Sequence, residues 1–234
     1  MGSMEDLPSP GHQVTRAELA RRIDHTLLKP TATAADIDKL CDEAVKYNFW
    51  SVCVNPVFVK QAASRLKGRG TKVCAVVSFP LGSSTPEVKL IEARRAIEDG
   101  AGEVDMVCNI GALKSGEDEA FFADINGVAS YCKRSKVVLK VILECCYLTD
   151  EEKVRGARIA EQAGADFVKT STGFGAGGAM ASDVALLRRT VTKRTGVKAS
   201  GGIGTVSKAL EMINAGADRI GTSSGAKMME ELAA

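Results

Sequence analysis

Histidine is nearly missing from this sequence, since only His12 and His25 occur among 234 residues. Several imidazoles are typical ligands of a zinc site, and histidine is the side chain most often used as a general acid or base. The sequence therefore leaves almost no room for a zinc site with several imidazoles or for histidine-based catalysis. If the protein is an enzyme, carboxylates, lysines or cysteines must carry its protons.

Long apolar runs are also absent. No stretch of about 18 apolar residues occurs, and no secretory signal pattern stands at the start, so we expect a cytoplasmic protein with no membrane partner. The seven cysteines include no Cys-x-x-Cys pair and are odd in number, which favours reduced, packed thiols. Charged residues make up 26% of the chain but leave a net charge of only +2, which argues against nucleic acid as a partner.

One sequence pattern recurs along the chain: a predicted helix ends at glycine, and a short apolar strand follows. Three copies align, at residues 98–105, 162–169 and 214–221. We expect Gly100, Gly164 and Gly216 to be left-handed helix caps, because glycine carries no Cβ penalty at positive φ. The recurrence of one helix–glycine–strand unit indicates a βα repeat architecture.

The strand and helix count predicts the fold class. Apolar or β-branched runs predict strands near residues 22–26, 50–54, 73–78, 103–108, 137–143, 166–171, 197–200 and 218–222. Helical patterns fall at 34–47, 56–67, 86–99, 117–134, 149–163, 180–194, 205–215 and 224–232, several with a starting cap or proline such as Thr85-Pro86, Thr149 and Ser182. Eight alternating units predict an α/β protein with a single (β/α)₈ TIM barrel, and a doubly wound sheet is the alternative.

The chain is expected to hold one domain. Residues 1–13, with Pro8, Pro10 and Gly11, are interpreted as a short disordered leader. No linker-like stretch divides residues 14–234, which we therefore assign to the barrel.

Polar side chains end most of the predicted strands, where the active site of such a barrel lies. The repeat alignment puts Asp105 and Lys169 at equivalent heights on their strands. The complete set at the strand ends is Asp24, Asn55, Ser78, Asp105, Asn109, Glu144, Lys169, Lys198 and residues 221–224.

Lys169 is unusual because it ends a buried strand and precedes a glycine-rich loop. Lys198 ends the next strand, so the two ammonium groups should face each other in the barrel mouth. A nearby positive charge and desolvation both favour a neutral amine, and this frees one amine to attack a carbonyl at neutral pH. A phosphate clamp is the alternative role for Lys169.

Asp105 and Lys140 are the expected ionic partners of these lysines. Asp105 is interpreted as the ion-pair partner that holds a buried lysine in place, as a proton shuttle, or as both. Lys140 shares its pleat face with Glu144, and we interpret it as an interior pairing partner with no direct part in chemistry.

The glycine-rich loops point to anion binding. Residues 173–178 match G-x-G-x-x-G, but the next strand ends in Lys198 where an NAD site would need an acidic residue. Gly201-Gly202 and Ser223-Ser224 each stand just before a predicted helix, where many barrels bind phosphate on backbone amides. Plain turns are the alternative reading of these loops.

Taken together, these segments resemble the 2-deoxyribose-5-phosphate aldolases, which are class I aldolases of the TIM-barrel type. The resemblance covers about residues 15–230 and is carried by residues 23–28, 51–56, 103–111, 140–144, 168–173 and 197–203. Lys-Thr-Ser-Thr-Gly at 169–173 and Lys-Ala-Ser-Gly-Gly at 198–202 are its most specific pieces.

The resemblance implies roles for individual residues. Lys169 matches the Schiff-base lysine that cleaves 2-deoxyribose 5-phosphate into glyceraldehyde 3-phosphate and acetaldehyde. Asp105 and Lys198 match the proton relay, and Asp24 matches a supporting carboxylate. The residues that match the sugar-phosphate binding region are Thr172, Gly173, Gly201, Gly202, Ser223 and Ser224. The resemblance implies no metal and no organic cofactor, a small sugar phosphate as ligand, and a homodimer or larger homo-oligomer.

Two departures from the family pattern stand out. The family often carries arginine shortly after the Gly-Gly pair, whereas Gly204 stands here, and this could weaken phosphate binding. Some members also end in a tyrosine that helps proton transfer, which the last residues of this sequence lack. The competing hypotheses are another Schiff-base aldolase or transaldolase, a phosphate-binding barrel isomerase, and a sugar-phosphate-binding protein without catalysis.

Overall fold

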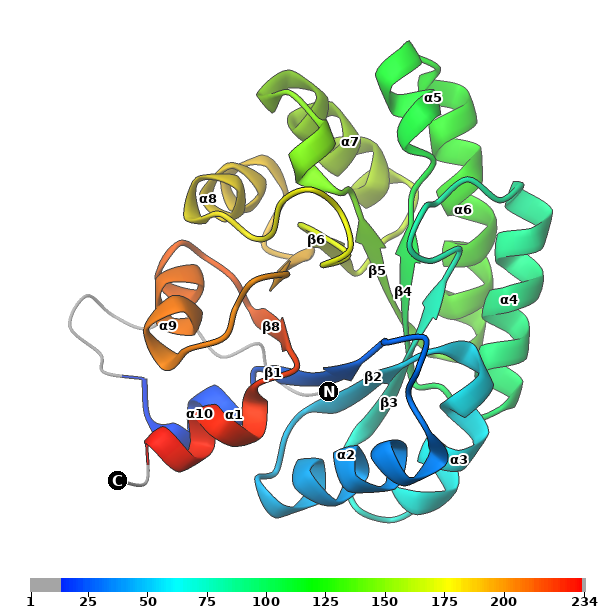
Figure 1. Cartoon of the computed structure of the whole chain (residues 1–234). Helices are drawn as coiled ribbons and strands as arrows, with labels where there is room; N and C mark the ends of the chain where they lie inside the picture. The colour runs from blue at the N-terminus through cyan, green and yellow to red at the C-terminus, as the bar shows by residue number, and fades with distance from the viewer. Residues whose placement is uncertain (1–13, 233–234) are drawn as a thin grey trace.

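Eight parallel strands close into a barrel and follow one another in chain order around it. The computed structural model describes residues 14–232, so the predicted leader at residues 1–13 lies outside the described residues. The closed barrel in Figure 1 confirms the TIM-barrel prediction and excludes the doubly wound sheet. The strands are β1 (Ile23–Leu27), β2 (Ser51–Val54), β3 (Lys72–Val77), β4 (Glu103–Val107), β5 (Val138–Ile142), β6 (Phe167–Lys169), β7 (Gly196–Ser200) and β8 (Arg219–Thr222).

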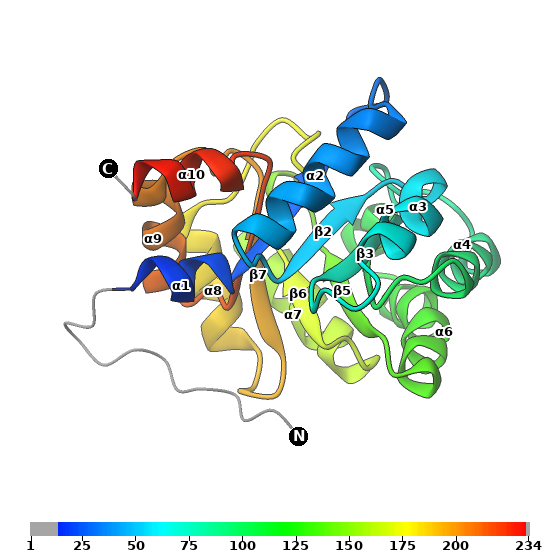
Figure 2. The same cartoon turned by 90° about the horizontal axis from the view of Figure 1, so that it is seen from below.

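Helices surround the strands on the outside of the barrel, as Figures 1 and 2 show. They are α1 (Arg16–Ala20), α2 (Ala34–Lys46), α3 (Val59–Arg65), α4 (Pro86–Glu98), α5 (Ile110–Ser115), α6 (Asp118–Ser135), α7 (Asp150–Gln162), α8 (Ala181–Thr190), α9 (Val206–Asn214) and α10 (Gly225–Glu231), with 3₁₀ turns at Pro56–Phe58 and Cys145–Tyr147. The sequence patterns missed α1 and α5, which are short. Within residues 14–232, no helix combines the length and the apolar character needed to cross a membrane.

Glycine ends three of these helices as predicted. Gly100, Gly164 and Gly216 follow α4, α7 and α9 with φ values of 108°, 99° and 108°. In each case the next residue donates its N–H back into the last helical turn; Ala101, for example, donates to the Ala96 carbonyl at 2.9 Å. This left-handed cap turns the chain sharply into the following strand.

The predicted helix starts are only partly correct. Thr149 caps α7 through a reciprocal pair of hydrogen bonds with Glu152. Ser182 was expected to start α8, but the helix begins at Ala181 after Met180, so Ser182 lies within the first turn. The cap prediction for Ser182 is therefore wrong.

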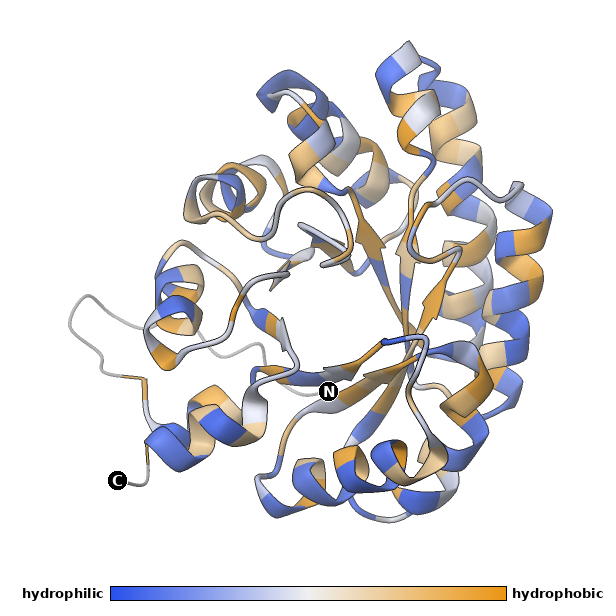
Figure 3. Cartoon of the chain, in the orientation of Figure 1, coloured by the Kyte–Doolittle hydropathy of each residue, from blue (hydrophilic) through white to orange (hydrophobic). Residues whose placement is uncertain are grey.

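Apolar side chains from the strands and the helices pack together in one core, and Figure 3 shows hydrophobic residues on both kinds of element. Small and branched residues dominate this core, and Phe49 and Phe121 are the largest buried aromatic side chains in it. Burial of this apolar surface is the main driving force that holds the helices against the barrel.

The inside of the barrel is different, because much of it is charged. Barrel interiors are usually filled by valine, isoleucine and leucine. Here seven ionisable side chains, each at most 5% exposed, form what we call the buried charge cluster: Asp24, Glu103, Asp105, Lys140, Lys169, Lys198 and Arg219. These side chains come from six of the eight strands, so barrel closure is what brings them together.

Candidate active site

Strand register places the two lysines side by side. Lys169 on β6 pairs directly with Lys198 on β7, and Asp105 on β4 pairs with Lys140 on β5. Because side chains alternate between the two faces of a strand, these four side chains share the inner face of the barrel. The predicted juxtaposition of the two ammonium groups is therefore present in the structure.

Asp105 is the centre of the site. Its Oδ2 accepts hydrogen bonds from Lys169 Nζ and Lys198 Nζ, each at 2.7 Å. Its Oδ1 accepts one from Lys140 Nζ at 2.9 Å. One fully buried carboxylate thus holds three amines, and two of them share a single oxygen.

Asp24 supports Lys198 from the other side. Its Oδ2 lies 2.6 Å from Lys198 Nζ, and Ser51 Oγ donates to its Oδ1 at 2.6 Å. Arg219 also contacts Oδ1 through its guanidinium group. Asp24 therefore lies beside Lys198, and the supporting role that the resemblance implies for it stays a prediction.

Lys140 pairs inside the barrel, although with partners other than Glu144. Its Nζ lies 2.5 Å from Glu103 Oε2 and 2.9 Å from Asp105 Oδ1. Lys140 is fully buried, and its contacts are those of an interior pairing partner. Glu144, which the pleat pattern placed on the same face, contacts Thr172 instead.

The cluster shifts the titration of its own members. Burial alone would raise the pKa of Asp105, but the positive charges of Lys140, Lys169 and Lys198 outweigh it and hold that pKa well below its ordinary value. Burial would lower the pKa of Lys198, but the carboxylates of Asp105 and Asp24 outweigh it and raise that pKa. The same balance raises the pKa of Lys140.

These shifts predict how stability depends on pH. The lowered pKa of Asp105 means that its contribution is present above its ordinary value of 3.8 and is lost as the pH falls through the lower folded value. The raised pKa of Lys198 means that its contribution is present below 10.5 and is lost as the pH rises through the higher folded value. We therefore expect the free energy of unfolding in urea to be level between about pH 7 and 8, and to fall toward pH 9 as the unfolded chain ionises cysteines such as Cys108, whose pKa burial raises to about 12 in the folded protein. A steep change inside that window would contradict this prediction.

Arg219 contacts two aromatic rings at the end of the barrel where the strands begin. The Arg219 guanidinium carbon lies 4.8 Å from the ring centroid of Trp50 and 5.9 Å from that of Phe167. Trp50 Nε1 donates to Glu103 Oε1 at 2.7 Å. Arg219 Nη2 also lies 3.0 Å from Glu103 Oε2. We call Glu103, Arg219, Trp50 and Phe167, which lie at or just before the start of their strands below the lysines, the floor of the barrel.

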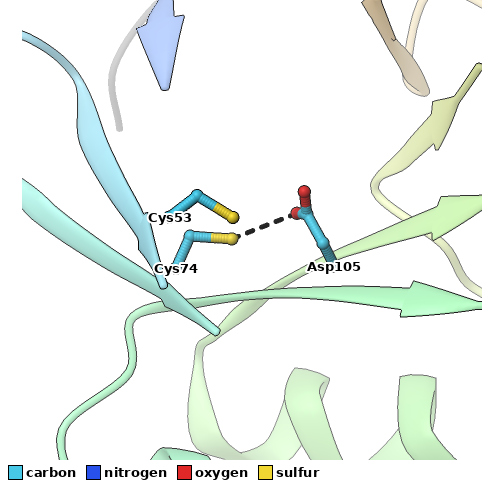
Figure 4. Close-up of side chains that lie close together, drawn as sticks. All are labelled: Cys53, Cys74 and Asp105. Carbon is cyan, nitrogen blue, oxygen red and sulfur yellow. Dashed lines mark hydrogen bonds between the residues drawn. The ribbon is translucent and has the colours of Figure 1, made fainter. Parts of the chain in front are cut away.

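Two thiols line the barrel beside Asp105. Figure 4 shows Cys53 and Cys74 pointing into the barrel from neighbouring strands, and Cys74 Sγ donates to Asp105 Oδ1 at 3.1 Å. Cys53 is 1% exposed, in keeping with the packed thiol expected from the sequence. The two thiols and the carboxylate lie within 4.8 Å of one another, but both carboxylate oxygens already bind lysines. All seven cysteines of the chain are free.

The loop after β6 is anchored on Glu144. Glu144 is 2% exposed and has a left-handed φ of 57°. Its carboxylate accepts hydrogen bonds from the backbone N–H of Thr172 at 3.2 Å and from the Thr172 hydroxyl. Both donors of Thr172 are therefore engaged by Glu144, which ties down the loop that leads to Gly173.

The glycines predicted to bind phosphate lie close together above the cluster. Gly201 and Gly202 have φ values of 90° and 74°, a region that other residues rarely adopt. A Cβ atom on Gly201 would lie 3.1 Å from the Gly178 Cα atom and 3.3 Å from that of Gly173. Only glycines permit this approach of the loops after β6 and β7.

Ser223 and Ser224 follow β8 at the same end of the barrel. Ser223 is exposed, and Ser224 directly precedes α10. The N–H of Ser224 donates to Thr222 Oγ1 at 2.9 Å, and Thr222 in turn bonds the Ile203 carbonyl at 2.6 Å. The β8 loop is thus linked to the loop that carries Gly201 and Gly202.

Other polar residues at the strand ends have structural partners. Asn55 Nδ2 donates to the Leu28 carbonyl at 3.2 Å, and Asn109 Oδ1 caps α5 by accepting from the N–H of Ala112 at 3.1 Å. Ser78 donates its N–H to Glu92 at 2.6 Å. The hydroxyl of Ser78 also accepts from the N–H of Ser84 at 3.4 Å, so all three side chains hold loops in place.

Sequence reasoning missed Glu103 and Arg219, which belong to the buried charge cluster, and Cys74, whose thiol donates to Asp105. A signal for two of them was present in the alternation of side chains. Glu103 stands two residues before Asp105, and Arg219 stands two before Gly221, so each faces inward below a strand-end position.

A closed barrel with two adjacent lysines on one carboxylate is the architecture of a barrel enzyme equipped for carbonyl chemistry. The sequence profile described as DeoC/LacD family aldolase matches residues 19–231. This chain belongs to the DeoC/LacD family of aldolases and is thus a lyase.

Similar proteins span nearly the same length. A deoxyribose-phosphate aldolase of Carboxydothermus hydrogenoformans is 57% identical over 94% of this chain and 97% of its own length. One from Thermococcus kodakarensis is 56% identical over 93% and 98%. A solved structure of deoxyribose phosphate aldolase from Aeropyrum pernix, described as a unique tetramer, has a TM-score of 0.88 and 38% identity over 94% of this chain and 93% of that one.

Proposed function

We propose that the protein cleaves 2-deoxyribose 5-phosphate reversibly into glyceraldehyde 3-phosphate and acetaldehyde through an imine on Lys169. One observation carries this proposal: Lys169 and Lys198 both donate to Asp105 Oδ2 at the end of the barrel where active sites lie. The names of the relatives support the same reaction.

The contacts favour Lys169 over its neighbours as the nucleophile. Lys169 contacts one carboxylate, Asp105, and shares the accepting oxygen with Lys198. Lys198 and Lys140 each contact two or more carboxylates. Conversion of an amine into a covalent adduct displaces its ionic contacts, so Lys169 reacts with the smallest loss of buried ion pairing.

The reaction then follows from the chemistry of an imine. The Lys169 amine adds to the C1 aldehyde of the open-chain sugar, and loss of water leaves a protonated imine. As the 3-hydroxyl gives up its proton, the C2–C3 bond breaks and its electrons pass into the imine, which becomes an enamine. C3 leaves as the aldehyde of glyceraldehyde 3-phosphate. The enamine takes a proton at C2, and water releases acetaldehyde and restores the amine.

Asp105 and Lys198 supply the proton relay in this proposal. Asp105 lies within hydrogen-bond distance of both amines, so a proton can pass between Lys198 and the reacting centre through its carboxylate or through water. Asp24 holds Lys198 in position and stays ionised, because the charges of Arg219 and Lys198 outweigh burial and lower its pKa.

The glycine loops form the phosphate-binding region of the proposal, at Gly173, Gly201, Gly202, Ser223 and Ser224. The backbone amides of the glycines and of Ser223 offer donors to an anion, whereas the N–H of Ser224 already donates to Thr222 Oγ1. Thr172 contributes by holding the loop, since its own donors bind Glu144. We also propose a cytoplasmic homo-oligomer, which the tetramer described for the Aeropyrum pernix relative supports.

The proposal is tested by trapping the imine. Purified protein is incubated with acetaldehyde and borohydride, digested, and mapped by mass spectrometry. We expect a single reduced adduct on Lys169, because reduction makes the imine permanent. An adduct on another lysine would point to a different Schiff-base enzyme, and no adduct at all would favour the isomerase or binding-protein hypotheses.

Gly204 provides a separate prediction about the phosphate. We expect Gly204→Arg to raise the preference for the phosphorylated over the free sugar about tenfold in kcat/KM, since one charge-assisted hydrogen bond contributes about 1.5 kcal/mol. Gly204 has room for a side chain, because nothing lies within 4 Å of a Cβ atom placed there. Gly204→Ala is the matched control and should leave the preference unchanged. A preference that Gly204→Arg does not raise would show that the loop directs this position away from the phosphate.

A further inference from the structure

A serine follows each of the two adjacent lysines at the same spacing. Ser171 stands two residues after Lys169, and Ser200 stands two residues after Lys198. Because Lys169 and Lys198 are paired in register, the two serines lie one step further toward the mouth on neighbouring segments of chain. Glycines follow on both segments, so the order along each is lysine, serine, glycine.

Both serine hydroxyls are buried without a partner. Ser171 is 0% exposed and Ser200 is 5% exposed, and neither Oγ atom has a hydrogen-bond partner among residues 14–232. The intervening Thr170 behaves differently, because its hydroxyl donates to the Ser200 carbonyl at 3.3 Å and accepts from the Ser200 N–H. The Thr170 hydroxyl, which links the two segments, therefore has hydrogen-bond partners, whereas the hydroxyls of Ser171 and Ser200 have none among the described residues.

Both serines lie between the lysines and the glycine loops. A Cβ atom placed on Gly221 of β8 would lie 2.2 Å from Ser200 Oγ and 3.1 Å from Lys198 Cε, so this hydroxyl sits next to the end of Lys198. Glycine at position 221 leaves space for both. Ser171 follows the end of β6 in the same direction, and its Cβ lies 3.5 Å from a Cβ atom placed on Gly201, next to the glycine loops.

The position of these hydroxyls matches the position of one substrate group. Two residues of extended chain span about 7 Å, which places the serines between the amines and the glycine loops. In the proposed substrate, C1 joins Lys169 and the phosphate at C5 lies farthest from it. The hydroxyl that lies between the two ends and keeps its proton through bond cleavage is the one at C4.

We propose that Ser171 and Ser200 form a subsite that binds the C4 hydroxyl of the sugar phosphate. This inference rests on the proposed function. A buried hydroxyl with no partner is costly, and a substrate hydroxyl that donates to one serine and accepts from the other satisfies all three groups at once. Sites that hydrogen-bond a substrate hydroxyl discriminate strongly against analogues that lack it.

The test removes the hydroxyl from the protein and from the substrate in turn. Ser171→Ala and Ser200→Ala are assayed with 2-deoxyribose 5-phosphate and with the analogue that also lacks the C4 hydroxyl, 2,4-dideoxypentose 5-phosphate. We expect each variant to lose about tenfold in kcat/KM on the natural sugar phosphate and to match the unaltered protein on the analogue. Ser182→Ala, at an exposed position on α8, is the control and should behave like the unaltered protein on both.

Each other outcome has a definite meaning. Equal losses of kcat/KM on both substrates would give the serines a structural role. Thr170→Val removes a hydroxyl that has structural partners, and it is the reference for a loss of that kind. Losses of kcat/KM that occur on the sugar phosphate but not on free 2-deoxyribose would show that the serine hydroxyls bind the phosphate, not the C4 hydroxyl. No loss on any substrate would also overturn the subsite. Turnover by the unaltered protein, with an imine on Lys169, shows that the proposed function stands even if the subsite fails. If the unaltered protein shows neither turnover nor an imine, both the proposed function and the subsite are overturned.

Discussion

Replacing Lys169 with arginine is expected to lower turnover of 2-deoxyribose 5-phosphate by about 10⁴-fold or more, because removal of a covalent nucleophile has effects of this size. Arginine keeps the positive charge beside Asp105, which Lys169 contacts at 2.7 Å. A guanidinium group does not give up its proton in proteins, so it cannot form an imine. Steady-state kinetics on the variant, with far-ultraviolet circular dichroism to confirm folding, measure the effect.

The control for Lys169→Arg is the same change at a solvated lysine. Lys39 on α2 is 76% exposed at its side chain, and Lys39→Arg should leave kinetics and stability unchanged. The rival isomerase hypothesis makes the opposite prediction for Lys169→Arg, because an electrostatic clamp works with either cation. Activity within tenfold of the unaltered protein would therefore refute the imine mechanism.

Replacing Asp105 with asparagine should have the largest effect on stability, at about 3–5 kcal/mol, because removal of one side of a buried ion pair leaves the other uncompensated. Lys140 and Lys198 keep Glu103 and Asp24 as partners. Lys169 has no other ionic partner among the described residues. Urea unfolding monitored by fluorescence of Trp50, the single tryptophan, gives the free energy directly.

The same variant separates the structural role of Asp105 from its role in the relay. Asp42→Asn breaks an exposed ion pair with Arg65 and should cost less than about 1 kcal/mol. Turnover by Asp105→Asn should fall about 10²–10⁴-fold at a temperature where the variant is fully folded. Turnover that stays normal in the folded variant would remove Asp105 from the relay and leave it only the structural role.

The barrel could be predicted from the sequence because its signals are local. A glycine at positive φ ends a helix wherever it occurs, and Gly100, Gly164 and Gly216 mark three such ends. The same repeat gave the strand-end positions of Asp105 and Lys169, because side-chain direction follows from alternation along a strand. The repeat does not show which residues pair between strands. The strand register in the structure shows that Lys169 pairs directly with Lys198.

The floor of the barrel could not be predicted, because its contacts join strands that are far apart in the chain. Glu103 on β4 meets Arg219 on β8 only after the barrel has closed, 116 residues apart in sequence. Glu144 was missed as a loop anchor for a related reason. Its partner Thr172 comes from the loop after the next strand, and the strand-end pattern does not show which polar residues bind each other.

The contacts of Arg219 also decide which amines stay charged. Its guanidinium group binds Asp24 and Glu103 and does not lose its proton, so against the effect of burial it helps to keep both carboxylates ionised, with a lowered pKa. Against the same effect, those carboxylates help to raise the pKa of Lys198 and of Lys140. The charges therefore alternate in sign from Arg219 toward the mouth of the barrel, so a substitution at Arg219 would change the two lysines without contacting either of them.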